Sequence, residues 1–188
     1  MRHRRGQARL PTFEYSSPGA YFVTVCTLNK EPILGEMQGD SLVPSPAGVI
    51  VADAWHDLPQ HYAHLVLDAF VVMPNHVHSV VFLVQSSSTD SVGAGLRPAP
   101  THSAGPGVSE RASPRRHGLS EIIRAFKSFS ARRINALRGS PGIPVWQRGF
   151  YDHVIRNDDD LARIREYIVT NPLRWSLDEE NPSARRGT

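Results

Sequence analysis

Two apolar runs joined by a short turn form the clearest hydrophobic pattern in the chain. Residues 65–72 and 79–84 are rich in β-branched and aromatic side chains, and Met73, Pro74 and Asn75 separate the first run from His76. Such runs favour strands, whereas Pro and Asn favour turns. The pattern predicts a β-hairpin whose second strand begins near His76.

The segments before this hairpin predict a strand and a helix. Residues 20–29 are rich in β-branched and aromatic side chains, and residues 32–44 place turn residues between short apolar stubs. The first segment predicts a strand, and the second a small hairpin or an irregular excursion. Ser45 followed by Pro46 is typical of an N-cap and first turn, and it predicts a helix with one apolar stripe towards the sheet.

The C-terminal half predicts two more helices and one more strand. Residues 119–138 carry a strong amphipathic pattern, and the segment from Val145 leads into a short predicted strand at residues 152–155. Asn157 is placed to cap a last helix with three acidic residues in its first turn. That helix should stop near Asn171, because Pro172 disfavours helical geometry in the residue before it.

The order strand, helix, strand, strand, helix, strand, helix predicts an α+β protein. We expect a ferredoxin-like βαββαβ core with an antiparallel sheet and one extra C-terminal helix. A chain of 188 residues suffices for one core, and we expect a single domain at residues 12–175. Gly, Pro and Ser dominate residues 86–118, which predicts a disordered insert, with flexible tails at residues 1–11 and 176–188.

Charge and cysteine usage narrow the setting. The formal net charge is +3, with Lys30 and Lys127 as the only lysines. Arginine suits phosphate recognition better than lysine does. The single Cys26 excludes an internal disulfide and fits a reducing cytosol, and no apolar run is long enough to span a bilayer. These features predict a cytoplasmic protein with no membrane partner.

Two histidines on the predicted hairpin are the sharpest chemical signal. His76 and His78 are separated by one residue, so on a strand they point the same way, about 6.6 Å apart along the chain. Two imidazoles on one face could bind one metal ion. The alternative is a pair of polar residues on a solvated face.

The last helix offers a second half for such a site. Tyr167 and Asn171 are four residues apart and so share one helix face. The Asn171 amide oxygen could complete a His, His, Asn set, which suits Mg²⁺ or Mn²⁺ and leaves positions for a substrate phosphate. Tyr167 would then be a nucleophile beside the metal. The alternatives are a packed tyrosine, an asparagine C-cap, and His153 or Asp152 as the third ligand.

The helix predicted at residues 119–138 is a candidate surface for nucleic acid. Its charged side has no acidic residue after Glu121, which favours a phosphate-facing role over a merely solvated face. Arg148, in the loop that follows, adds a further cation. The candidate DNA-binding residues are Arg124, Lys127, Arg132, Arg133 and Arg148.

Three motifs together resemble a known group of proteins. They are FVVMPNHVH at residues 70–78, WQRGFYDH at 146–153 and YIVTNP at 167–172. In this combination the chain resembles the single-tyrosine transposases of the HUH endonuclease superfamily, most closely the REP-associated tyrosine transposases, which are linked to palindromic repeats in bacterial genomes. The resemblance covers roughly residues 15–175, although the insert is longer than in the shorter members.

The resemblance implies a mechanism and a substrate. It implies that His76, His78 and Asn171 hold a divalent Mg or Mn ion. Tyr167 would then attack a phosphodiester of single-stranded DNA, forming a 5′-phosphotyrosine link and releasing a 3′-hydroxyl. The implied partners are single-stranded DNA and DNA hairpins, bound by a monomer or a homodimer.

Three other functions stay open at the level of sequence. Another HUH nuclease, of the relaxase or replication-initiator type, would also nick single strands. A non-catalytic DNA-binding repressor descended from a transposase would bind without cutting. An RNA-binding module on a ferredoxin-like core would carry stacking aromatics on its middle strands, where this chain has two histidines.

Overall fold

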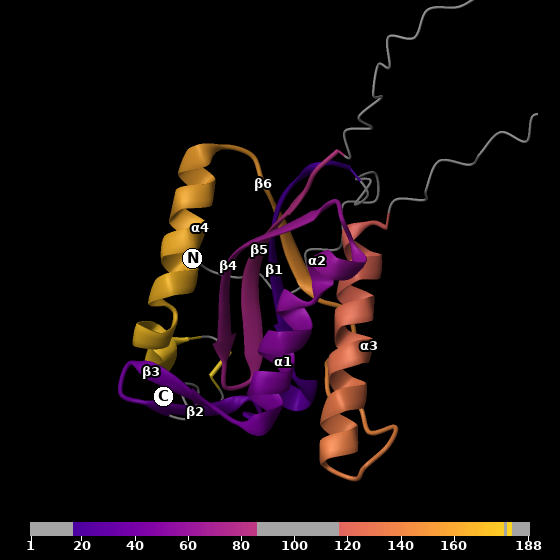
Figure 1. The fold of residues 1–188 in the computed structure, drawn as a ribbon. Coiled ribbons are helices and arrows are strands. Elements are labelled where there is room, and N and C mark those ends of the chain that lie inside the picture. Colours follow the sequence, from indigo (N-terminus) through magenta and orange to yellow (C-terminus); the bar gives the residue numbers. More distant parts are fainter. Residues whose placement is uncertain (1–16, 86–116, 179, 182–188) are drawn as a thin grey trace, which may run out of the picture.

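A computed structural model of the protein describes residues 17–85, 117–178, 180 and 181 (Figure 1). In these residues a twisted antiparallel sheet forms the middle layer, and helices cover both of its faces. Within the same ranges, no helix is both long and apolar enough to cross a membrane. The predicted insert at residues 86–118 lies outside the described residues except for His117 and Gly118, and so does the predicted tail at residues 1–11.

The sheet has the strand order expected of the ferredoxin-like topology. Its strands are β1 (Gly19–Cys26), β4 (Leu65–Met73), β5 (His76–Leu83) and β6 (Tyr151–Ile155), arranged in the order β4-β5-β1-β6. All three pairings are antiparallel, and the β4–β5 register shifts between Leu67 and Phe70. The predicted α+β class with an antiparallel sheet is confirmed.

One face of the sheet carries the larger core. It is covered by α1 (Pro46–His56), the short α2 (Leu58–His61) and α3 (Leu119–Leu137) (Figure 1). Alternate strand residues such as Val23 and Val77 are buried against the helices. The Trp55 ring meets the Phe126 ring edge to face at 4.9 Å between centroids.

The other face is covered by α4 (Asp158–Thr170), which lies on the opposite side of the sheet from α1 and α3 (Figure 1). Ile164 and Ile168 of this helix form a smaller cluster with Phe22 and Val80. A 3-10 helix, η2 (Pro172–Leu177), follows α4. This face also carries His76 and His78, because residues of the same parity along β5 point to the same side.

A two-stranded hairpin joins β1 to α1. It consists of β2 (Gly35–Gln38) and β3 (Ser41–Pro44), as expected for the segment at residues 32–44. Glycine is required at position 48, on α1, because a Cβ there would lie 2.0 Å from the Leu34 carbonyl oxygen. The close contact seats α1 on the chain entering the hairpin.

The predicted helix caps are present. The Ser45 hydroxyl accepts a bond from the Gly48 amide at 3.1 Å, and the Asn157 side chain accepts one from the Asp160 amide at 2.8 Å. The first strand ends at Cys26, earlier than predicted, because the chain turns into η1 (Leu28–Lys30), where Asn29 has φ +53°.

The C-terminal residues differ from the predicted flexible tail in the part that the structure describes. Residues 176 and 177 complete η2, and the Asn181 side chain is buried and donates to the Trp175 carbonyl at 2.9 Å. The polar composition that suggested a tail instead places hydrogen-bonding groups against the protein.

Candidate metal and nucleophile site

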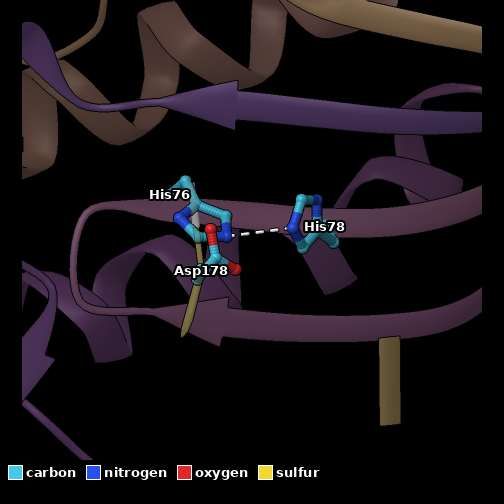
Figure 2. Close-up of side chains that lie close together, drawn as sticks. All are labelled: His76, His78 and Asp178. Carbon is cyan, nitrogen blue, oxygen red and sulfur yellow. Dashed lines mark hydrogen bonds between the residues drawn. The ribbon is translucent and has the colours of Figure 1, made fainter. Parts of the chain in front are cut away.

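The turn between β4 and β5 delivers two buried imidazoles to one point. His76 opens β5 and His78 follows with one residue between them, while Val77 points into the opposite core. Their Nε2 atoms lie 3.0 Å apart. The dashed line in Figure 2 marks this contact. Both rings are almost fully buried. Two ring nitrogens at this separation converge on a single point, as shared ligands of one ion would.

Asn75 fixes the tautomer of His76. Its side-chain NH₂ group donates to the carbonyls of Lys30 at 3.1 Å and Glu180 at 2.7 Å. The Asn75 Oδ1 therefore faces His76 Nδ1, at 2.8 Å, as an acceptor. Consequently Nδ1 of His76 carries the proton, and Nε2 presents its lone pair towards His78.

His76 is held as a neutral ring. Burial lowers the pKa of His76 to about 4, although the nearby carboxylates of Asp178 and Glu180 act in the opposite direction. A neutral imidazole is the form that ligates metals. The protein therefore presents this ligand ready for an ion at neutral pH.

His78 contacts a hydroxyl at each end of its ring. Its Nδ1 lies 2.8 Å from the Thr24 hydroxyl on β1, and its Nε2 lies 3.3 Å from the Tyr167 hydroxyl on α4. A threonine hydroxyl both donates and accepts. Thr24 thus supports either tautomer of His78, including the one with the Nε2 lone pair free for a metal.

Tyr167 reaches the histidines across the gap between α4 and the sheet. Its ring packs edge to face on Phe22, with 6.1 Å between centroids, and lies 5.2 Å from the His78 ring. These contacts direct the phenol oxygen at the nitrogen pair. The helix face predicted for Tyr167 and Asn171 is therefore the face that meets the histidines.

Asp178 adds a carboxylate that the sequence reasoning missed. It follows η2, and Figure 2 shows its side chain beside His76 and His78. Ligand atoms from these three residues all lie within 4.8 Å of one another. The signal available in the sequence was weak, namely a run of three acidic residues at 178–180 shortly after Trp175, without hydrophobic periodicity.

Asn171 is brought to the same place. It is buried, its Nδ2 donates to the Asp178 carboxylate at 3.1 Å, and its Oδ1 is buried without a hydrogen-bond partner among the described residues. Such an orphaned acceptor costs about 1–3 kcal/mol. A cation would satisfy it.

The donor set fits a divalent metal. It comprises two neutral ring nitrogens, one carboxylate and one unsatisfied amide oxygen, drawn from the hairpin and from the segment after Thr170. Imidazole suits transition metals, whereas carboxylate and amide oxygens suit Mg²⁺ and Mn²⁺. The mixture matches Mn²⁺ best, with Mg²⁺ as the harder alternative.

Lys30 and Glu180, which lie near the histidine pair, form an ion pair with each other. Burial would raise the pKa of Glu180, but its contact with Lys30 holds that pKa below its usual range. Burial and the Glu180 carboxylate raise the pKa of the Cys26 thiol to about 12. The thiol is therefore protonated at neutral pH, and the described group that could hold an ion comprises His76, His78 and Asp178.

The alternative third ligands from the sequence lie elsewhere. His153 Nε2 is 2.9 Å from the Asp160 carboxylate on α4. Asp152 pairs in register with Val23, whose side chain belongs to the opposite core. Neither joins the histidine pair.

The five candidate DNA-binding residues differ in how far the protein already uses them. Lys127 donates to the Gln147 and Gly149 carbonyls at 2.6 and 2.7 Å, and burial lowers its pKa. Arg133 lies 3.7 Å from Asp53 and 3.6 Å from Asp57. Arg124, Arg132 and Arg148 are exposed.

Sequence comparison places the chain beside a bacterial relative of nearly equal length. An uncharacterized protein of Haemophilus influenzae is 30% identical over 177 residues, which cover 94% of this chain and 93% of the relative. A second protein of that organism, provisionally named a REP-associated tyrosine transposase, is 50% identical over 30 residues, 16% of this chain and 17% of its own. No family model matches the chain.

The fold also has solved counterparts. A REP-associated tyrosine transposase bound to a REP hairpin superimposes with a TM-score of 0.53 at 18% identity, covering 86% of this chain and 70% of that one. A provisionally named transposase of Deinococcus radiodurans, also 18% identical, reaches 0.46, with 90% and 96% of the two chains covered. The resemblance first seen in the three sequence motifs is confirmed.

Proposed function

We propose that this chain is a metal-dependent DNA endonuclease and strand transferase. The chain belongs to one protein family with the Haemophilus relative that it matches over 93% of that relative's length. It has the fold of a REP-associated tyrosine transposase. Its substrate is single-stranded DNA next to a hairpin. Such a substrate places its action in the cytoplasm.

One observation carries the proposal. The Tyr167 hydroxyl lies 3.3 Å from His78 Nε2, which itself lies 3.0 Å from His76 Nε2. A phenol packed in a core has no need of two converging imidazoles, a carboxylate and an orphaned amide oxygen. A phenol that attacks a phosphodiester does need a cation beside the phosphate.

The residues then have separate roles. His76, His78 and Asp178 would hold the metal, and the Asn171 amide oxygen would supply the remaining protein ligand. An ion held there would provide a Lewis acid beside the scissile phosphate. Phe22 and α4 orient the Tyr167 ring towards that point.

The chemical step exchanges one phosphate ester bond for another. The Tyr167 oxygen loses its proton and forms a bond to phosphorus, while the bond from phosphorus to the 3′ oxygen breaks and that oxygen takes up a proton. The products are a 5′-phosphotyrosine ester and a 3′-hydroxyl. A 3′-hydroxyl that attacks the ester reverses the step and rejoins strands without ATP.

A hairpin substrate is supported by the fold counterpart, whose structure holds a REP hairpin. The exposed Arg124, Arg132 and Arg148 supply cations for the DNA backbone. Arg133 reaches DNA only by leaving Asp53 and Asp57, and Lys127 only by leaving two backbone carbonyls. We therefore expect these two residues to contribute less.

The test is covalent capture. Labelled single-stranded oligonucleotides carrying hairpins from the palindromic repeats nearest the gene are incubated with the protein and Mn²⁺, Mg²⁺ or EDTA, then run on a denaturing gel. We expect a metal-dependent protein–DNA adduct, stronger with Mn²⁺, that Tyr167→Phe abolishes. Tyr21→Phe is the matched control and should form the adduct normally, because the Tyr21 ring lies in the opposite core and its hydroxyl donates to the Ser17 carbonyl.

The outcomes separate the remaining functions. Hairpin binding with neither adduct nor nick under any metal would contradict the enzyme and leave a DNA-binding repressor. An adduct that persists in Tyr167→Phe would mean that another residue is the nucleophile.

A further inference from the structure

A pocket on the face opposite to Tyr167 has the groups that bind an unpaired nucleotide. It lies between Tyr62, at the end of α2, and α3, and it has a volume of about 320 Å³. Figure 1 shows that α3 lies on the same side of the sheet as α1. That volume is at the small end of ligand pockets. The lining residues used below are Tyr62, His117, Glu121, Arg124, Phe129 and Arg132.

The pocket uses a stripe of α3 that the core does not. Residues 121, 124, 128 and 132 repeat at helical spacing on one side, whereas Ile122, Phe126 and Ile134 face the sheet. The side of α3 that lines the pocket is therefore separate from the side that packs in the core.

Planar groups line this wall. The Phe129 side chain is 45% exposed, although other apolar residues of α3 form its buried face. The His61 ring stacks on it at 6.0 Å, and the Arg132 guanidinium lies 4.8 Å from its centre. Aromatic rings and guanidinium planes are the groups on which unpaired bases stack.

The pocket contains both cationic and anionic side chains. Arg124 and Arg132 are exposed cations. The Glu121 carboxylate accepts from the Gly118 amide at 3.2 Å and lies 3.3 Å from His117 Nδ1, so its position is fixed. Arginine attracts phosphate, whereas a fixed carboxylate accepts N–H groups of a base edge.

We propose that this pocket binds one unpaired nucleotide of single-stranded DNA, with the base stacked on Phe129 and Arg132 and the phosphate on Arg124. The proposal rests on the proposed function for its choice of DNA. Because the pocket and Tyr167 lie on opposite faces of the sheet, the bound nucleotide is remote from the scissile phosphate along the strand.

The experiment measures binding apart from cleavage. A fluorescein-labelled 12-nucleotide single strand of mixed sequence, and the same length of abasic strand, are titrated with full-length protein in EDTA and followed by anisotropy. We expect the abasic strand to bind more weakly. We expect Phe129→Ala to weaken binding of the strand with bases about five- to hundredfold, with little effect on the abasic strand.

Two matched pairs test position and charge. Leu137→Ala, another exposed apolar residue of α3 outside the pocket, should bind as wild type. Arg124→Gln should weaken both strands and reduce the salt dependence by about 0.7 in the log–log slope, whereas Arg138→Gln should change neither. A strand carrying 5-iododeoxyuridine should photocrosslink to the peptide containing Phe129.

Unchanged binding by Phe129→Ala, or crosslinks only to other peptides, would overturn the pocket. Tighter, Phe129-dependent binding of a 12-nucleotide RNA would overturn the choice of DNA. Failure of the proposed function would give a different result. The wild-type protein would then form no covalent adduct, while its binding to the single strand would still depend on Phe129.

Discussion

At the scale of single residues, the candidate site depends on groups that orient others. Asn75 leaves His76 with a lone pair on Nε2, and Thr24 does the corresponding work for His78 through a hydroxyl that accepts or donates. Hydrogen bonds of this kind set the tautomer and direction of a ligating ring.

Replacing Thr24 by Val removes that hydroxyl while keeping the shape of the side chain. We expect Thr24→Val to lower Mn²⁺ affinity about 10- to 100-fold, because the Thr24 hydroxyl no longer stabilises the Nδ1–H tautomer of His78. Isothermal titration calorimetry gives the affinity. Thr24→Ser keeps the hydroxyl and should bind nearly as wild type, so equal losses in both variants would contradict this role.

The sequence could predict these ligands only in part, for reasons visible residue by residue. The strand and helix periods place His76 with His78, and Tyr167 with Asn171, on shared faces, but preferring Asn171 to His153 or Asp152 depended on the family resemblance. Asp178 follows a 3-10 turn, which has no such period to read. The bonds of Lys127 were also missed, because a helical wheel locates a Cα and not the end of a long side chain.

At the scale of elements, α4 is tied to the edge strand of the sheet. The Arg165 guanidinium donates to both carboxylate oxygens of Asp68 on β4, at 2.8 and 2.5 Å. The hydrogen bond from Arg165 lowers the pKa of Asp68 more than burial raises it. The pair limits rotation of the helix that carries Tyr167.

The pH dependence of this tie has a definite sign. Since the Asp68 pKa is lower in the folded state, the pair stabilises the protein above the ordinary aspartate pKa of 3.8, and this contribution is lost as the pH falls through the folded pKa. We expect Asp68→Asn to melt below wild type at pH 6, and the gap to narrow as the pH falls below 3.8. Differential scanning calorimetry across that range measures both, and a constant gap would contradict the assignment.

At the scale of the whole molecule, the two sides of the sheet are held unequally. Among the described residues, α1, α2, α3 and the larger buried cluster lie on one side of the sheet, whereas α4 packs on the other side over a smaller cluster. Regions with few buried contacts open first. The layer that carries Tyr167, Asn171 and Asp178 is therefore the one expected to move.

Hydrogen exchange followed by mass spectrometry tests this ordering. Without metal, amides of α4 and η2 should exchange faster than those of β1 and β5. Adding Mn²⁺ should slow α4 and η2 selectively, because their side chains and the histidines of the sheet would then share one ion. Equal protection of both layers without metal would show that α4 is as firmly held as the core.

The fold was predictable further than the site. Alternation in residues 65–84, the caps at Ser45 and Asn157 and the order of elements sufficed for the topology, because each is a local signal. Which layer each helix would cover is not a local signal. That information lies in the matching of Phe22 and Val80 with Ile164 and Ile168, which only the assembled sheet brings together.

The register shift in β4 bears on solubility. β4 lies at the outer edge of the sheet, and an edge strand offers unpaired backbone groups to other chains. The shift between Leu67 and Phe70 interrupts that row of groups, and the Asp68–Arg165 ion pair stands at the interruption. A strand of another molecule could pair only with the short regular stretches before and after this shift. The part of β4 that holds α4 through Asp68 therefore also disfavours edge-to-edge aggregation.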